Sequence, residues 1–125
     1  MGDAKELGAK GERLAASFLR RQGYRILQRN YTCQYGEIDL VARHGNQVVF
    51  VEVKTRSGTG FGGPAEAVTL DKQRQLIRVA ENYRTEKSLS GVPCRFDVVS
   101  ILIEEGRKPE FELYTSAFDF TGWRT

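Results

Sequence analysis

The sequence predicts an α/β fold in which a mixed sheet carries a helix on each side. Three observations lead to this class: an amphipathic helical pattern over residues 4–22, a hairpin signal at His44–Gln47, and a helical stretch between two apolar strands. Those strands, Val48–Arg56 and Cys94–Ile103, are apolar on both faces, as central strands of a sheet are. A strand, a crossover helix and a second strand form a βαβ unit, so these two strands should be parallel.

The first helix is predicted from apolar residues at near-helical spacing, which are Leu7, Leu14, Phe18 and Leu19. Gly23 should stop it. Gly8 and Gly11 lie inside the helix, where each costs about 1 kcal/mol relative to Ala. We therefore expect this side of the helix to approach another backbone closely.

Two strands should follow, Tyr24–Thr32 and Gly36–Arg43, before the apolar strand Val48–Arg56. The segment Gly36–Arg43 alternates, which places Ile38, Leu40 and Ala42 on one face and Glu37, Asp39, Val41 and Arg43 on the other. The turn residues His44–Gln47 join it to Val48–Arg56 as a hairpin.

The hairpin predicts which charged residues face each other. With the turn centred between Gly45 and Asn46, Asp39 lies opposite Glu52 and Glu37 lies opposite Lys54. A loop with an odd number of residues would shift this register by one. Two facing carboxylates destabilise a sheet unless a proton or a cation lies between them, so the pair calls for a compensating partner.

The second half of the chain begins with the glycine-rich segment Ser57–Pro64, which is either a flap over a site or a plain connector. Pro64–Lys87 should be helical in two pieces, with a break near Thr69-Leu70. An alternating edge strand, Glu110–Tyr114, follows Cys94–Ile103 through a hairpin. The aromatic tail should pack over the sheet with Phe118, Phe120 and Trp123. The predicted order is therefore α-β-β-β-α-β-β, in a single domain spanning residues 1–125.

Composition restricts the function classes only loosely. The 125 residues carry a net charge of +3, with basic residues in excess over the two helical regions. This permits a polyanionic partner, although charged helix faces also serve solubility alone. The polar N-terminus and the absence of a long apolar run predict a cytoplasmic protein without membrane contact. Cys33 and Cys94 have no metal-ligand spacing and are expected to be free thiols or small buried residues.

The charged residues of the hairpin have a chemical interpretation. Mg²⁺ prefers oxygen ligands and is often held by one or two carboxylates together with phosphate oxygens. Asp39 and Glu52 would supply the carboxylates, with the backbone carbonyl of Val53 as a third ligand. Lys54, on the same strand face as Glu52, would orient an attacking water or stabilise developing negative charge. The pattern indicates metal-assisted phosphodiester hydrolysis. The alternatives are a structural Glu52–Lys54 ion pair and a structural Glu37–Lys54 cross-strand pair.

These residues resemble the PD-(D/E)xK nuclease superfamily, and more closely the YraN-like family of small bacterial proteins, distant relatives of the archaeal Holliday junction resolvases. The resemblance rests on these segments: Gly8-Ala9-Lys10-Gly11-Glu12, Arg29-Asn30-Tyr31, Gly36-Glu37-Ile38-Asp39-Leu40, Phe50-Val51-Glu52-Val53-Lys54-Thr55-Arg56 and Arg95-Phe96-Asp97-Val98-Val99. It implies a restriction-endonuclease-like αβββαβ core and a catalytic triad of Asp39, Glu52 and Lys54. It also implies that Glu12 adds an acidic group to a Mg²⁺ or Mn²⁺ site. Ile38 stands where the superfamily often has Pro.

The sequence and the resemblance together predict a metal-dependent endonuclease that acts on DNA, including branched or repair-intermediate DNA. A non-catalytic nucleic-acid-binding module on the same fold is the alternative, and an adaptor that binds no nucleic acid is a third reading. Phosphate contacts are expected from Thr55, Arg56, Lys72 and Gln75, each of which could equally be a solvated side chain. A homodimer is compatible with symmetric cutting of two strands. Asp97 is expected to pair with a basic residue such as Arg95, and His44 to serve the turn.

Overall fold

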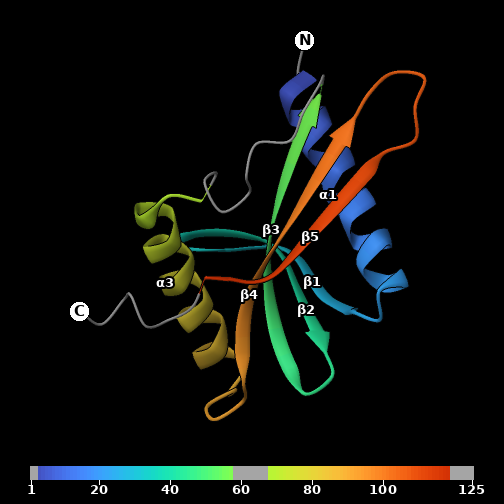
Figure 1. The fold of residues 1–125 in the computed structure, drawn as a ribbon. Coiled ribbons are helices and arrows are strands. Elements are labelled where there is room, and N and C mark those ends of the chain that lie inside the picture. The colour runs from blue at the N-terminus through green and yellow to red at the C-terminus, as the bar shows by residue number, and fades with distance from the viewer. Residues whose placement is uncertain (1–2, 58–67, 119–125) are drawn as a thin grey trace.

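The computed structural model describes residues 3–57 and 68–118, which form one five-stranded sheet between two helices (Figure 1). The helices are α1 (Asp3–Arg21) and α3 (Leu70–Glu86). The strands are β1 (Arg25–Cys33), β2 (Gly36–His44), β3 (Gln47–Ser57), β4 (Cys94–Ile103) and β5 (Glu110–Phe118). They lie side by side in chain order, with β3 and β4 parallel and the other neighbours antiparallel. The predicted α/β class and element order are confirmed.

The element bounds follow the prediction closely, with one larger difference at β5. This strand continues to Phe118 because the ring of Phe118 stacks on Phe96 of β4 at 4.4 Å between centroids. The predicted start of the second helical piece near Thr69-Leu70 is confirmed, since the Thr69 side chain caps α3 by accepting a hydrogen bond from the backbone N–H of Lys72. The predicted loop beyond Ser57, the helical piece before Val68, and Phe120 with Trp123 lie outside the described residues.

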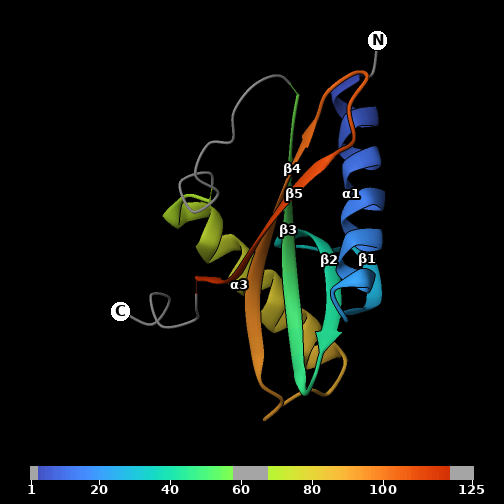
Figure 2. The ribbon, with the colours of Figure 1, turned by 45° about the vertical axis from the view of Figure 1, so that its right-hand side comes forward.

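Helix α1 packs on one face of the sheet through small side chains, which lets the two backbones come close (Figure 2). Ala15, Ala16 and Leu19 are fully buried against apolar residues of the central strands. Gly11 lies directly over β3, where an added Cβ would come within 2.0 Å of Thr55 Oγ1. A close approach is therefore found at Gly11, but to the side chain of Thr55 and not to a backbone as predicted. No close neighbour is found for Gly8, since nothing in the described part of the chain lies within 4 Å of a Cβ added there.

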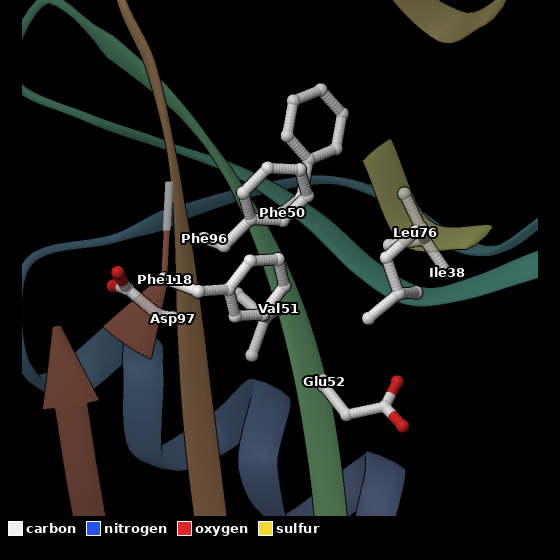
Figure 3. A pocket seen from close by; sticks show the side chains of 8 residues that line it. All are labelled: Ile38, Phe50, Val51, Glu52, Leu76, Phe96, Asp97 and Phe118. Atoms are coloured by element: carbon white, nitrogen blue, oxygen red, sulfur yellow. The ribbon is translucent and has the colours of Figure 1, made fainter. Parts of the chain in front are cut away.

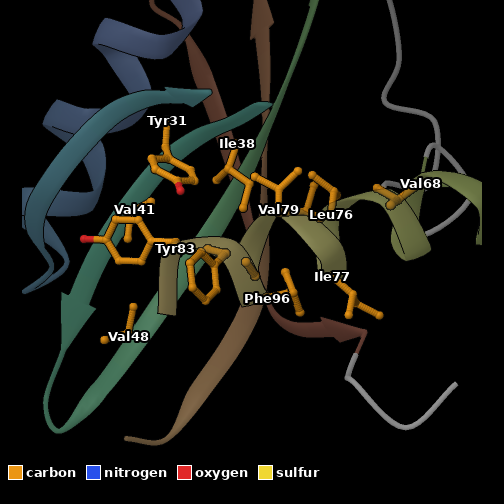
Figure 4. Close-up of a cluster of buried hydrophobic side chains, with 13 residues drawn as sticks. Tyr31, Ile38, Val41, Val48, Val68, Leu76, Ile77, Val79, Tyr83 and Phe96 are labelled. Carbon is orange, nitrogen blue, oxygen red and sulfur yellow. The ribbon is translucent and has the colours of Figure 1, made fainter. Parts of the chain in front are cut away.

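Helix α3 covers the opposite face through a larger, aromatic core (Figure 4). The ring of Tyr83 meets Tyr31 of β1 edge-on at 5.0 Å and Phe50 of β3 at 5.8 Å between centroids. Leu76 and Val79 are buried in the same cluster. The helix thus fixes the position of β1 relative to β3.

A buried polar network ties the strand ends together on the α1 side. Asp97, which is fully buried, accepts hydrogen bonds from Tyr24 Oη at 2.7 Å, Arg95 Nε at 3.0 Å and the Ser116 backbone N–H at 3.0 Å. The predicted Asp97–Arg95 pair is confirmed. His44 stacks on Tyr24 at 4.2 Å, and its Nδ1 lies 3.0 Å from Arg95 Nη2. His44 is therefore part of this network as well as of the turn.

Strand β2 changes the side toward which it points its apolar residues. Leu40 and Ala42 share a face, as predicted, and pack toward α1, but Ile38 packs toward α3 in the same cluster as Val41. The strict alternation predicted for this strand is therefore wrong at Ile38. The β1–β2 hairpin bends away from β3 toward α3 (Figure 1), where the Gln75 side-chain amide donates to the Tyr35 carbonyl at 3.1 Å.

Both cysteines are free thiols, as predicted, and both are half-buried. Neither of the described helices is long and apolar enough to cross a membrane.

Candidate functional site

The site lies where β2 separates from β3. The predicted hairpin register is confirmed from His44 opposite Gln47 to Leu40 opposite Val51, and the paired residues end there. Asp39, the next residue, places its carboxylate in the fork between the strands, where Oδ2 accepts a hydrogen bond from the Val53 backbone N–H at 2.8 Å. A side chain thus takes the place of the strand backbone as hydrogen-bond partner of β3.

Glu52 lies on the α3 side of β3, beside this fork, and only 8% of its surface is exposed. It borders a crevice lined by Ile38, Phe50, Val51, Leu76, Phe96, Asp97 and Phe118 (Figure 3). The crevice is mostly apolar and has no room for a water molecule. The Glu52 carboxylate therefore loses much of its hydration, and a charge in such a place needs a partner.

Lys54 supplies one such partner. Its Nζ lies 3.4 Å from Glu52 Oε2, and the two side chains emerge on the same face of β3, as the sequence predicts. The Lys54 side chain is 30% exposed, whereas that of Glu52 is 9% exposed. Lys54 therefore connects the buried carboxylate to the surface of the molecule.

The surroundings of Asp39 raise its pKa to about 8, from an ordinary value of 3.8. Burial is the largest cause, followed by the negative charge of Glu52. The hydrogen bond from Val53 opposes the rise, while Glu12 adds a smaller repulsion. Asp39 and Glu52 thus form a pair in which a second negative charge is costly. A proton or a cation on the pair removes that cost.

Glu12 reaches the site from α1, on the other side of the sheet. It is half-buried, and its charge acts on Asp39 more weakly than that of Glu52. Within residues 3–57 and 68–118 there is no group of three or more His, Cys, Asp or Glu side chains that could hold a metal ion. The structure therefore brings together two of the three predicted carboxylates, Asp39 and Glu52, with Glu12 at longer range.

The expected Glu37–Lys54 pair does not form among the described residues. Glu37 lies opposite Thr32 of β1, whose Oγ1 donates to Glu37 Oε2 at 3.5 Å. The physical reason is the separation of the strands at Asp39, which carries Glu37 away from β3.

Two of the residues expected to contact phosphate already contact other residues of the chain. Thr55 faces Gly11 of α1, and Gln75 donates to the Tyr35 carbonyl. Lys72 lies one helical turn before Leu76, which lines the crevice beside Glu52. Arg56 continues the row of Glu52 and Lys54 along β3, and its buried Nε has no hydrogen-bond partner among the described residues.

One residue near the site was not identified from the sequence. Ser100 lies beside Lys54 in the parallel register of β3 and β4 and is 1% exposed, and its buried Oγ finds no hydrogen-bond partner in residues 3–57 and 68–118. On its other side it is paired with Glu112 of β5, which accepts a hydrogen bond from the Tyr114 hydroxyl. The available signal was a lone hydroxyl in the otherwise apolar run Val98-Val99-Ser100-Ile101-Leu102.

Comparison with known proteins places these residues within a family. The model of the Uncharacterised protein family UPF0102 matches residues 11–101, which include Glu12, Asp39, Glu52 and Lys54. The chain belongs to the UPF0102 family. The predicted YraN-like membership is thereby confirmed.

Individual UPF0102 relatives match nearly end to end. A UPF0102 protein of Nocardia farcinica is 48% identical over 118 residues, which cover 94% of this chain and 93% of the relative. One of Syntrophotalea carbinolica is 48% identical over 117 residues, with 94% of each chain covered. One of Geobacter sulfurreducens is 49% identical over 115 residues, covering 92% of this chain and 90% of the relative.

Proposed function

We propose that this protein is a metal-dependent endonuclease that hydrolyses phosphodiester bonds in DNA, with branched or repair-intermediate DNA as its substrate class. The observation that carries the proposal is the pair of carboxylates, Asp39 and Glu52, held together at the fork of two strands with Lys54 beside them. A purely structural site would not need two carboxylates that repel each other. A site that recruits a cation uses that repulsion.

The donor set fits Mg²⁺ or Mn²⁺. Asp39 and Glu52 supply hard oxygen ligands, and Mg²⁺ usually takes one or two carboxylates and completes its shell with water and substrate phosphate oxygens. Glu12 and the carbonyl of Val53 are the further candidate ligands on the chain. When bound, the ion would lower the pKa of a water molecule and polarise the phosphate.

The chain's own residues prepare the site in three ways. The Val53 N–H holds the Asp39 carboxylate in the fork, so its orientation is set before any ligand arrives. The apolar crevice beside Glu52 excludes water, which strengthens electrostatic interactions there. Lys54 has an ammonium group that can turn from Glu52 toward a phosphate oxygen, because its side chain is only partly buried.

Cleavage assays test this proposal against its alternative, a non-catalytic nucleic-acid-binding module. Linear duplex, single-stranded and four-way DNA are incubated with the protein and Mg²⁺ or Mn²⁺. Cleavage that is lost in Glu52→Gln and in Lys54→Met, and kept in Glu37→Gln, supports the endonuclease. Glu37 is the matched control because it is an exposed carboxylate on β2 that forms no part of the pair.

Two other outcomes overturn the endonuclease. Salt-dependent binding without cleavage of any substrate would identify a binding module. Absence of any salt-dependent binding would identify an adaptor that does not act on nucleic acid. Sedimentation of the protein with and without DNA tests the homodimer expected for symmetric cutting.

A further inference from the structure

Tyr35 is an exposed aromatic residue held in a fixed position at the tip of the β1–β2 hairpin. The residue is 43% exposed, while its backbone carbonyl accepts a hydrogen bond from the Gln75 side chain of α3 at 3.1 Å. The next residue, Gly36, has φ +138, and an added Cβ there would lie 2.6 Å from Gln75 Nε2. The hairpin tip is therefore packed tightly onto α3, yet the Tyr35 side chain is left partly in solvent.

Two hollows open on either side of this tyrosine, along the exposed face of α3. One, of about 460 Å³, is lined by Tyr35 with Arg78, Glu81, Asn82 and Thr85. The other, of about 330 Å³, is lined by Tyr35 with Asp71, Arg74, Gln75 and Arg78. Tyr35 and Arg78 border both. We call these lining residues together the Tyr35 surface.

The Tyr35 surface carries two arginines, Arg74 and Arg78, and two acidic residues, Asp71 and Glu81, so what matters is which of these charges are already paired. Arg78 forms no ion pair or hydrogen bond with any described residue. Arg74 lies 3.8 Å from Asp71, an exposed contact of the kind that contributes little. The negative charge of Glu81 is offset by Arg84 at 2.8 Å. An accessible ring flanked by available guanidinium groups suits a nucleotide, whose base stacks on the ring while its phosphate meets the arginines.

We propose that the Tyr35 surface binds an unpaired nucleotide of the DNA strand that enters the Asp39–Glu52 site. This deepens the proposed function and rests on it for the identity of the polymer. Only an unpaired nucleotide presents a free base face for stacking, because in a duplex the faces are covered by neighbouring bases. The substrate class is therefore DNA with a single-stranded segment next to the site, such as a splayed end or a branch.

The distance between the Tyr35 surface and the carboxylates suits this role. Tyr35 lies directly before β2 and precedes Asp39 by four positions, a separation of at most about 13 Å at 3.3 Å per residue. On α3, Gln75 contacts the hairpin tip, and its neighbour Leu76 lines the crevice beside Glu52. The two places are thus joined by both elements and lie within a few nucleotides of each other.

The test measures binding in EDTA, so that it does not depend on cleavage. A labelled splayed-arm DNA and the fully paired duplex of equal length are titrated with the protein and its variants. We expect Tyr35→Ala to weaken binding of the splayed DNA about 10-fold and of the duplex by less than about twofold, whereas Tyr35→Phe keeps the stacking ring and binds normally. Leu27→Ala is the matched control, since Leu27 is 42% exposed on β1 and lies outside the Tyr35 surface.

Salt dependence tests the arginine. Arg78→Gln is expected to lower the slope of log K against log salt by about 0.7, the value for one phosphate contact to a single strand. Arg107→Gln, which removes an exposed charge from the β4–β5 hairpin, should leave binding and slope unchanged.

The outcomes separate this proposal from the endonuclease. Unchanged binding of splayed DNA by Tyr35→Ala, with cleavage intact, overturns the Tyr35 surface alone. Equal weakening on splayed and paired DNA also overturns it, because stacking on an unpaired base would not be involved. Binding that depends on Tyr35, without cleavage under any condition, overturns the endonuclease alone.

Discussion

Replacing Asp39 by Asn should change how the stability of the protein depends on pH. In the metal-free protein the pKa of Asp39 is raised from 3.8 to about 8, chiefly by burial and by the charge of Glu52. A carboxyl group whose pKa is higher in the folded than in the unfolded state binds its proton more tightly when folded. Stability is therefore greatest below pH 3.8 for this group and is lost as the pH rises toward 8. Asn carries no proton to lose, so the variant lacks this contribution.

The size of the effect follows from the difference between the two pKa values. Each pKa unit corresponds to 1.36 kcal/mol, so the folded protein loses at most about 4 kcal/mol of stability through Asp39 between pH 5 and pH 9. Reorientation of Lys54 and entry of water reduce the cost of the new charge, and we expect about 2–3 kcal/mol. That is a large part of the 5–15 kcal/mol by which domains are usually stable.

Urea unfolding in EDTA at pH 5 and pH 9 measures this contribution. The relevant quantity is the stability of Asp39→Asn minus that of the wild type, which should rise by about 2–3 kcal/mol between the two pH values with m unchanged. Other effects of the substitution are the same at both pH values and drop out. Glu37→Gln, an exposed carboxylate on the same strand, should show no such rise. A rise below about 0.5 kcal/mol for Asp39→Asn would refute the coupling of burial and charge at the fork.

Three further substitutions or additions test other parts of the structure. Gly11→Ala should destabilise the protein by about 1–3 kcal/mol in urea unfolding, because the added Cβ would clash with Thr55. This cost should largely disappear in a Thr55→Ala background, and equal costs in both backgrounds would contradict the contact. Asp97→Asn should cost about 3 kcal/mol and lower Tm, since it removes the buried carboxylate that pairs with the half-buried Arg95. A loss under 1 kcal/mol would show that the network does not hold the strand ends. Mg²⁺ at about 100 times its Kd should stabilise the wild type by about 2.7 kcal/mol, measured by thermal unfolding, and leave the stability of Glu52→Gln nearly unchanged. Equal stabilisation of both proteins would show that the ion binds elsewhere.

The fold could be predicted from the sequence because its main signals are local. Small and apolar residues of α1 recur on one face, and β3 and β4 are apolar on both faces, so the layers follow from burial alone. The turn at Gly45-Asn46 also set the register of the β2–β3 hairpin as far as Leu40. The extension of β5 to Phe118 was missed, because it depends on stacking against Phe96, a contact that is distant in the sequence.

The site could be predicted only in part. The alternating pattern placed Asp39 near Glu52 correctly, but it extrapolated a regular hairpin to Glu37 and Lys54. Alternation describes one strand and carries no information about where its neighbour leaves it. Ser100 escaped notice for a related reason, since a buried hydroxyl in an apolar strand becomes significant only when the register places it beside Lys54.

The separation of β2 from β3 at Asp39, which the alternating pattern did not predict, creates the site. Had β2 remained paired with β3 through Asp39, the Val53 N–H would have bonded a backbone carbonyl, and the Asp39 side chain would have projected onto one face of the sheet. Because the hairpin turns toward α3, where Gln75 holds its tip, the carboxylate lies in the plane between the strands. There it is exposed to Glu52 from the α3 side and to Glu12 from the α1 side. The contact between Gln75 and the Tyr35 carbonyl therefore fixes both the carboxylate pair and the proposed nucleotide surface. Gln75→Ala should accordingly weaken the pH-dependent contribution of Asp39 and the binding of splayed DNA together, whereas an effect on only one would separate the two.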